Sequence, residues 1–265
     1  MTYDTVIVGS HVVLPIGIID KNLVLDDGKI IGLTNEIPTS DRKIKADGLV
    51  ALPGVIDTHV HYGVYSPIEH AAISESHAAA IGGVTTMMRM LRRGDSYKNS
   101  LLPQLNASSK SHYVDYGIHA SIFNLKQADE IQYCFENGVT SFKLYMNLGG
   151  EVGHVYMDME PGNNLLQDER VEVTSEIVQK VVKNAALLGC PVLVHAEDYE
   201  QCGCGIKKAK EKNLDGLHAW SESRHSESEI KSIKTISKYA RDSNCVLYFA
   251  HIGSRNALEQ ITEER

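Results

Sequence analysis

The pattern of hydrophobic and polar positions changes near Pro53. Before this residue, short runs rich in Val and Ile alternate with turn signals such as Asp26-Asp27-Gly28 and Asp47-Gly48. Apolar runs of this length between turn residues are typical of β-strands. Residues 1–52 are therefore predicted to form a small antiparallel β unit, whose single layer needs a partner to cover one face.

After Pro53, strand-like apolar runs alternate with helix-like stretches. Strands are predicted at residues 55–61, 85–90, 116–121, 140–145, 191–195 and 246–251. Helices are predicted at 70–81, 129–137, 174–188, 227–241 and 256–265. Strands that alternate with helices indicate a parallel sheet of βα units. The α/β fold expected for residues 53–265 is a (β/α)8 barrel of the TIM type, and the pattern accounts for about six of its eight strands.

Composition and charge narrow the classes of function. The 265 residues are 43% hydrophobic, which is enough for a sizeable core. The 34 acidic and 26 basic residues give a net charge of -8, which argues against nucleic acid or an anionic membrane as a partner. No apolar run approaches the roughly 20 residues of a membrane span, and the first residues lack the pattern of a secretory signal.

The five cysteines are scattered along the chain and odd in number. They do not suggest a disulfide framework, so a reducing, cytoplasmic location is expected. Cys202 and Cys204 form a CxC pair that could be half of a zinc site, but no matching Cys or His pair lies near it in the sequence. We interpret the two residues as ordinary loop thiols.

The strongest local signal is the run PGVIDTHVH, from Pro53 to His61. Because side chains alternate along a strand, Asp57, His59 and His61 share one face. Two neutral imidazoles two residues apart suit a first-row divalent metal, and Asp57 could support them or the strand end. The alternative is a strand with two buried histidines that bond to the backbone.

Lys143 is the second signal, in the run SFKLYM that begins at Ser141. Alternation points Lys143 into the barrel together with Ser141 and Tyr145. Burial and nearby cations lower the pKa of a lysine, so that a free amine becomes available. Such an amine can add carbon dioxide and become a carbamate, an anion able to bridge two metal ions. The alternative is a lysine that pairs with a carboxylate or reaches water.

His195 and His251 each end an apolar strand. A single histidine at such a place is more often structural than a ligand. In this chain, however, four of the predicted strands end in an imidazole or an amine, all at the edge where barrel active sites lie. The combination favours a closed barrel over an open sheet, and a metal site over isolated structural histidines.

The runs PGVIDTHVH, SFKLYM, VLVHAED and YFAHIGS, taken in this order, resemble the cyclic amidohydrolases of the amidohydrolase superfamily. The dihydropyrimidinase and hydantoinase branch is the most similar, and allantoinase and dihydroorotase are its relatives. AAAIGGVTT, YGIHAS and LHAWSESRHSESEI extend the resemblance over nearly the whole chain.

The resemblance implies an enzyme that opens a small cyclic amide, imide or ureide by attack of a metal-activated hydroxide. It implies two divalent metal ions, expected to be zinc. His59 and His61 would hold one ion, His195 and His251 the other, and carboxylated Lys143 would bridge both. It further implies that residues 1–52 are the N-terminal part of a small β-sandwich, and that the protein is a homo-oligomer, either a dimer or a tetramer.

Two features depart from the family pattern. Relatives have an aspartate near the eighth strand that ligates a metal and moves the proton. No residue after His251 matches it, so this aspartate is expected beyond residue 265. Relatives also have a substrate-contacting tyrosine where this chain has Leu148. His154 or Tyr156 could take its place, and the ring that is hydrolysed stays open among hydantoin-like, allantoin-like and dihydroorotate-like substrates.

Two other interpretations stay open. The chain could be a truncated or non-catalytic relative that keeps the fold as a scaffold. It could also be a mononuclear relative such as a deaminase, which uses the HxH pair without a carboxylated lysine. Outside these residues, Arg89 would be a candidate for binding an anionic substrate if its strand pointed it toward the barrel mouth.

Overall fold

The computed structural model describes residues 2–265. The chain divides into two compact units, and the boundary lies between Val55 and Ile56. The first unit consists of strands alone, whereas the second contains every helix of the described chain.

The first unit holds two small sheets, with the strand orders β5-β4-β1-β6 and β3-β2-β7. Its strands are β1 (Tyr3–Val8), β2 (His11–Leu14), β3 (Gly17–Asp20), β4 (Asn22–Asp26), β5 (Lys29–Thr34), β6 (Ser40–Lys45) and β7 (Val50–Ala51). Tight turns make β2–β3 and β4–β5 antiparallel, as the turn signals predict. The prediction is wrong for β1–β6 and β2–β7, which are parallel. These strands lie far apart in the sequence, where no tight turn imposes an antiparallel course.

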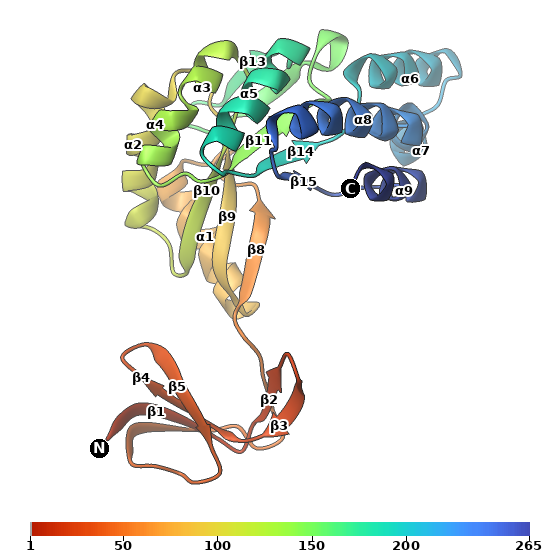
Figure 1. Ribbon diagram of the computed structural model, residues 1–265. Helices are drawn as coiled ribbons and strands as arrows, with labels where there is room; N and C mark the ends of the chain where they lie inside the picture. Colours follow the sequence, from red (N-terminus) through yellow and green to blue (C-terminus); the bar gives the residue numbers. More distant parts are fainter. Residues whose placement is uncertain (1) are drawn as a thin grey trace. The chain divides into compact units, whose positions relative to one another are not determined.

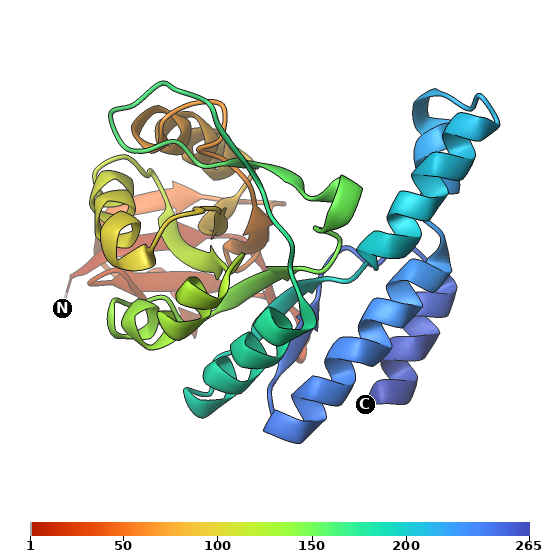
Figure 2. The ribbon, with the colours of Figure 1, turned by 90° about the horizontal axis from the view of Figure 1, so that it is seen from above.

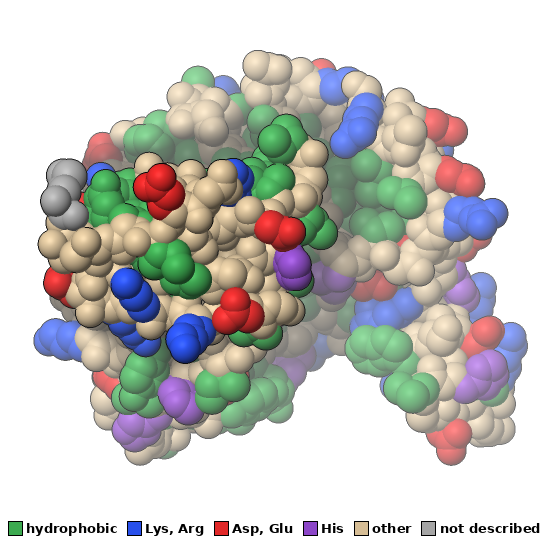
Figure 3. Space-filling view, turned by 90° about the horizontal axis from the view of Figure 1, so that it is seen from below, with side chains coloured by type: hydrophobic (Ala, Val, Ile, Leu, Met, Phe, Trp, Pro, Cys, Tyr) green, Lys and Arg blue, Asp and Glu red, His purple; other side chains and the backbone are tan. Residues whose placement is uncertain are grey.

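Apolar side chains of the first unit are unevenly covered. Val6 and Val24 are buried, whereas Ile16 and Ile18 are 88% and 65% exposed. Figure 3 shows hydrophobic side chains open to solvent among charged ones on the face that it draws. A unit this small cannot cover all of its own apolar surface.

The second unit is built on a sheet with the strand order β15-β14-β11-β10-β9-β8. Its strands are β8 (Val55–Val60), β9 (Val84–Leu91), β10 (Asp115–Ser121), β11 (Phe142–Tyr145), β14 (Val192–His195) and β15 (Leu247–Phe249). The successive pairs from β9 to β15 are parallel. The sheet curls as part of a TIM-type barrel (Figures 1 and 2), so the predicted α/β barrel and its six strands are confirmed.

Helices lie around the outside of this sheet (Figure 2). They are α1 (Ile68–Ile81), α2 (Tyr97–Ser109), α3 (Leu125–Asp129), α4 (Ile131–Glu136), α5 (Ser175–Leu187), α6 (Tyr199–Glu211), α7 (Gly216–Ser223), α8 (Ser226–Ser243) and α9 (Arg255–Glu264). In α5, the buried positions between Ile177 and Ala185 recur at helical spacing and pack into the core with residues of β11 and β14. Among residues 2–265, no helix combines the length and the apolar character needed to cross a membrane.

The helix predicted at 129–137 corresponds to α4, and the short helix α3, which the pattern does not predict, lies just before it, with Glu130 between the two. The Glu130 carboxylate is buried and accepts hydrogen bonds from the Ser96 hydroxyl and, at 2.7 Å, from the Tyr97 amide. It thereby satisfies the first turn of α2, a helix that its polar sequence does not predict. The hydrophobic pattern also fails to predict α6, α7 and the hairpin of β12 (His154–Met157) and β13 (Gln167–Arg170).

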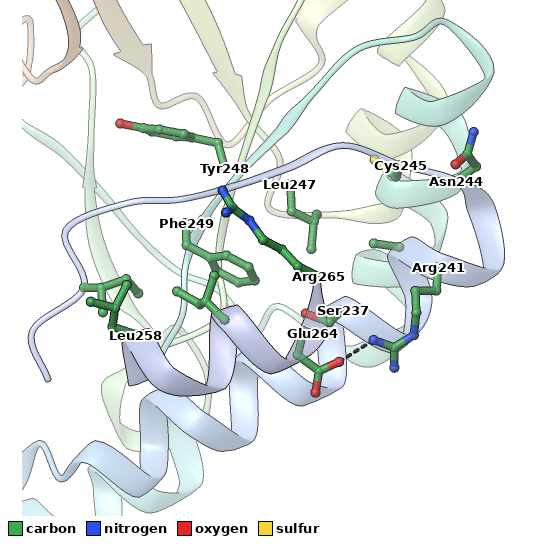
Figure 4. Close-up of a pocket in the computed structure, with 13 residues that line it drawn as sticks. Ser237, Arg241, Asn244, Cys245, Leu247, Tyr248, Phe249, Leu258, Glu264 and Arg265 are labelled. Carbon is green, nitrogen blue, oxygen red and sulfur yellow. Dashed lines mark hydrogen bonds and ion pairs between the residues drawn. The ribbon is translucent and has the colours of Figure 1, made fainter. Parts of the chain in front are cut away.

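A hollow of about 610 Å³ lies between β15, α8 and α9 (Figure 4). Its lining includes the apolar side chains of Leu247, Phe249 and Leu258, and an ion pair between Arg241 and Glu264 borders it. None of the four histidines predicted to bind metal lines it. The hollow is therefore separate from the candidate site.

Replacing Glu130 by alanine is expected to destabilise the second unit. The Ser96 hydroxyl and the Tyr97 amide would lose their acceptor, and a buried donor without a partner costs about 1–3 kcal/mol. Urea unfolding followed by circular dichroism measures the change in the free energy of unfolding. Glu136→Ala is the control, because Glu136 is an exposed residue of α4 whose loss should cost less than about 0.5 kcal/mol. Equal losses in the two variants would contradict this role of Glu130.

Candidate metal centre

The four predicted histidines meet at the carboxyl ends of three strands. His59 lies on β8 and His61 directly follows this strand. His195 is the last residue of β14, and His251 follows β15. The Nε2 atoms of His59 and His61 are 3.2 Å apart. The ring centroids of His59 and His251 are 5.2 Å apart, and those of His195 and His251 are 4.6 Å apart.

The curl of the sheet produces this cluster. β8 and β15 are its two edge strands, yet the side chains at their carboxyl ends approach one another. His251 adopts a φ of 40°, in the left-handed region that residues other than glycine seldom occupy. Strained backbone of this kind often marks a functional position, because only the surrounding structure holds it in place.

Lys143 lies on β11, and its side chain is completely buried. Its Nζ atom makes no hydrogen bond to any residue that the structure describes. Burial lowers the pKa of Lys143 to about 7. Near neutral pH a large fraction of the amine is therefore uncharged, and an uncharged amine is a nucleophile and a potential ligand.

Three of the predicted ligands, His59, His61 and His251, are uncharged at neutral pH as well. Burial, followed by the charge of Lys143, lowers the pKa of His59 to about 4. Burial, followed by the charge of Arg92, lowers the pKa of His61 to about 3. Burial, followed by the proximity of His195, lowers the pKa of His251 to about 4. Neutral imidazoles offer lone pairs to a metal ion, so the donor types fit a divalent transition metal.

The donors do not by themselves form a preformed site. Within residues 2–265, no three His, Cys, Asp or Glu side chains have the arrangement of a metal-binding group. The fit therefore depends on Lys143, whose buried amine has no hydrogen-bond partner among residues 2–265 and lies near His59 and His251. A carboxylated Lys143 would add two oxygen donors to the histidines, which do not form a metal-binding group by themselves.

His195 is held by a chain of polar contacts. Its Nε2 lies 2.6 Å from Oε2 of Glu197, and the same oxygen accepts a hydrogen bond of 3.0 Å from the Arg224 guanidinium. That guanidinium lies over the Trp220 ring, 4.0 Å from its centroid. Burial alone would raise the pKa of Glu197, but the contacts with His195 and Arg224 outweigh burial and lower it. Glu197 is thus a carboxylate at neutral pH and favours the tautomer in which Nε2 of His195 carries the proton.

A cavity of about 300 Å³ opens beside these residues. Its lining includes His195, Glu197, Trp220 and His251. The cavity therefore leads directly to two of the predicted metal ligands, and its volume suits a small ring.

Other residues singled out in the sequence lie elsewhere. Asp57 accepts a hydrogen bond from the backbone amide of His59 at 3.1 Å, so it supports the end of β8. Arg89 does not face the barrel mouth: it donates to Gln104 of α2 and is 1% exposed. Leu148 is buried in the core. His154 lies on the β12–β13 hairpin, 2.6 Å from Asp168.

The two cysteines of the CxC pair lie on α6, not in a loop. Cys202 is buried, whereas Cys204 is exposed, and both are free thiols. Because one thiol is buried and the other faces solvent, the two do not form a metal site together.

Sequence reasoning missed His119 and Asp158. His119 is buried on β10, where Nδ1 lies 2.5 Å from the Ser141 hydroxyl and Nε2 lies 3.1 Å from the Thr58 carbonyl oxygen. His119 thereby links β10 to Thr58 of β8 and to Ser141, which directly precedes β11. The signal for His119 was present in YGIHAS, where a polar residue interrupts a buried strand. Asp158 follows the β12 strand in an irregular segment, and no local pattern marks it.

Known proteins resemble this chain in sequence. No protein-family model matches the chain. The allantoinase of Solibacter usitatus is 26% identical over 268 residues, which cover 99% of this chain and 54% of that protein. An allantoinase of Desulfitobacterium hafniense is 27% identical over 270 residues, which cover 99% of this chain and 56% of that protein. The chain thus spans about half the length of the curated relatives it matches.

Solved structures with the same fold include two hydantoinases. The L-hydantoinase (dihydropyrimidinase) from Arthrobacter aurescens has a TM-score of 0.84 at 20% identity, and the match covers 99% of this chain and 56% of that one. A D-hydantoinase has a TM-score of 0.81 at 23% identity, with coverages of 98% and 54%. The second unit thus has the fold of these hydantoinases. In sequence the chain is similar to allantoinases, one of the kinds of protein that its sequence runs resemble.

Glu197→Gln is expected to release His195 from a single tautomer. A carboxylate can only accept a hydrogen bond, so it requires a proton on Nε2. The side-chain amide of glutamine can donate or accept a hydrogen bond, so the preference for one tautomer is lost. Nitrogen NMR of the imidazoles in chelator-treated protein measures this change. Glu200→Gln is the control, since it removes a carboxylate of α6 that is 67% exposed. An unchanged His195 spectrum in the Glu197 variant would contradict the role of Glu197.

Proposed function

We propose that this chain forms the binuclear metal centre of a hydrolase that opens cyclic amides, imides or ureides. One observation carries the proposal: the completely buried Lys143 amine has no partner among residues 2–265, and it lies near enough to His59, His61 and His251 to lower their pKa values. Two divalent ions, expected to be zinc, would complete this donor set. His59 and His61 would hold one ion, His195 and His251 the other, and carboxylated Lys143 would lie between them.

The relatives support the reaction class. The matched proteins are allantoinases and hydantoinases, one of them also titled a dihydropyrimidinase. Both kinds of name refer to cyclic substrates with amide bonds. Because the chain spans about half of each relative, the activity, like the homo-oligomeric state and the β-sandwich identity of residues 1–52, belongs to the proposal.

The residues of this chain would divide the work around the metals. When bound, the ions would acidify water and polarise the amide carbonyl. Glu197 keeps His195 in one orientation and one tautomer. The cavity beside His195 and His251 receives the ring and limits access of bulk water.

The identity of the ring stays a choice among related substrates. Sequence relatives favour allantoin, fold relatives favour hydantoin or a dihydropyrimidine, and dihydroorotate is a further alternative. Leu148 is apolar and buried, so it offers no hydroxyl to a developing oxyanion. We therefore assign the class of substrate and not a single member.

Lys143→Met is expected to abolish binding of both zinc ions. Methionine fills the buried space but has no amine to carboxylate, so the fold should persist while the bridge is lost. Elemental analysis measures zinc per chain, and circular dichroism monitors the fold. Lys183→Met, on the exposed face of α5, is the control and should keep its zinc. Two zinc ions per chain in the Lys143 variant would exclude a bridging role.

The unsubstituted protein is expected to hydrolyse a cyclic ureide in a zinc-dependent way. Allantoin, hydantoin, dihydrouracil and dihydroorotate form the test panel, and chelator treatment should remove the activity. Carbon NMR with labelled bicarbonate detects the carbamate of Lys143. A folded, metal-free protein would favour the scaffold alternative. A single ion without carbamate would favour a mononuclear deaminase.

A further inference from the structure

We infer that His119 is a positioning residue, which holds the HxH pair of β8 at a fixed distance from Lys143. The inference rests on the proposed function, because this distance matters only if both kinds of donor bind one metal centre. His119 lies on β10, a strand that carries none of the proposed ligands, and it is 5% exposed. Its two ring nitrogens contact residues that lie next to two different groups of donors.

The imidazole of His119 joins two segments that carry proposed ligands. Its Nε2 atom lies 3.1 Å from the carbonyl oxygen of Thr58, the residue before His59. Its Nδ1 atom lies 2.5 Å from the hydroxyl oxygen of Ser141, two residues before Lys143. A carbonyl oxygen can only accept a hydrogen bond, so Nε2 carries a proton. No carboxylate of the described residues pairs with this buried ring, so the ring is neutral, Nδ1 accepts, and the Ser141 hydroxyl donates.

The side chain of His119 lies on the inner face of the curled sheet. Ile118 and Ala120, the residues on either side of it, belong to the hydrophobic core that packs against the helices. Alternation along β10 therefore turns His119 the opposite way. Lys143 is turned inward by the same rule, because its two neighbours in β11 also belong to that core. The strand order is β10-β9-β8, so the imidazole reaches past β9 to contact Thr58.

The two partners of the imidazole differ in how firmly other contacts hold them. The carbonyl oxygen of Ser141 accepts a hydrogen bond of 3.2 Å from the Ala120 amide, so the backbone already fixes Ser141 beside β10. Thr58 lies on β8, an edge strand that has β9 on one side and no described strand on the other. Ile56 of the same strand is 60% exposed. The imidazole therefore holds a loosely packed segment at a fixed position relative to a firmly held one.

A binuclear site tolerates little movement between its donors. Distances from metal to ligand vary by only about 0.2 Å, and a working site needs its groups within about 0.5 Å of their places. The HxH pair would follow any shift of Thr58, whereas Lys143 would not. Loss of the contact with His119 would thus separate the two histidines from the carboxylated lysine while the sheet stays folded.

The test uses two substitutions of the same residue. His119→Gln keeps a nitrogen donor as many bonds from the backbone as Nε2, whereas His119→Asn reaches only as far as Nδ1. Calorimetry measures the affinity and stoichiometry of zinc, and circular dichroism monitors the fold. His119→Asn is expected to weaken zinc binding roughly 10- to 100-fold, as is typical for residues that orient metal ligands. His119→Gln should stay within about threefold of the unsubstituted protein. Unchanged zinc affinity in His119→Asn, or equal losses in both variants, would overturn the inference.

Ser76→Ala is the matched control. The Ser76 hydroxyl is buried on α1 and also joins two segments, because it accepts a hydrogen bond of 2.9 Å from the Tyr113 amide and donates one to the Ala72 carbonyl oxygen. Its removal should lower stability and leave zinc affinity unchanged. A loss of zinc affinity in Ser76→Ala equal to that in His119→Asn would show that general destabilisation, and not positioning, is the cause.

A measurement without metal keeps the inference separate from the proposed function. Hydrogen exchange of residues 55–61 is followed by mass spectrometry in chelator-treated protein. Exchange of this segment should be faster in His119→Asn than in the unsubstituted protein, and unchanged in His119→Gln and Ser76→Ala. If the unsubstituted protein binds no zinc, the proposed function fails, and hydrogen exchange alone decides whether His119 holds β8. Unchanged exchange of residues 55–61 in His119→Asn would contradict that role.

Discussion

The candidate site depends on one constraint: the Lys143 amine is buried and has no hydrogen-bond partner in the part of the chain that the structure describes. Phe142 and Leu144, on either side of Lys143, are completely buried, so β11 cannot turn to release the amine to water. A charged amine at such a place would be strongly unfavourable, and the lowered pKa of Lys143 expresses this cost. The neighbouring imidazoles are neutral for the same reason. The buried nitrogen atoms of this site are therefore uncharged and have free lone pairs, which a metal ion requires in its ligands.

The two sides of the mouth differ in their electrostatics. On the β14 side, Glu197 and Arg224 neutralise one another and hold His195. On the β9 side, one carboxylate serves two guanidinium groups, and the excess charge is positive.

The strands and the histidine cluster could be predicted because both follow from local rules. Alternation assigns His59, His61 and Lys143 to the inner face, and parallel strands place their carboxyl ends at one edge. The helix α2 could not be predicted, since its polar first turn depends on Glu130, a partner from another segment. The direction of Arg89 was equally undetermined, because β9 carries large side chains on both faces. Contacts between segments far apart in the sequence produce no periodic pattern of residues, so sequence patterns do not predict them.

His59 and His251 lie at opposite ends of the second unit in the sequence, although their rings are 5.2 Å apart. Contacts of such long sequence separation form late, because the loop that joins them must close first. During synthesis, β8 and the HxH pair leave the ribosome long before β15. The proposed pair of ions, joined through Lys143, could therefore be bound in full only after the whole sheet has curled. By mass action the pair would then stabilise the curled sheet over open intermediates, and metal supply would affect the folding yield.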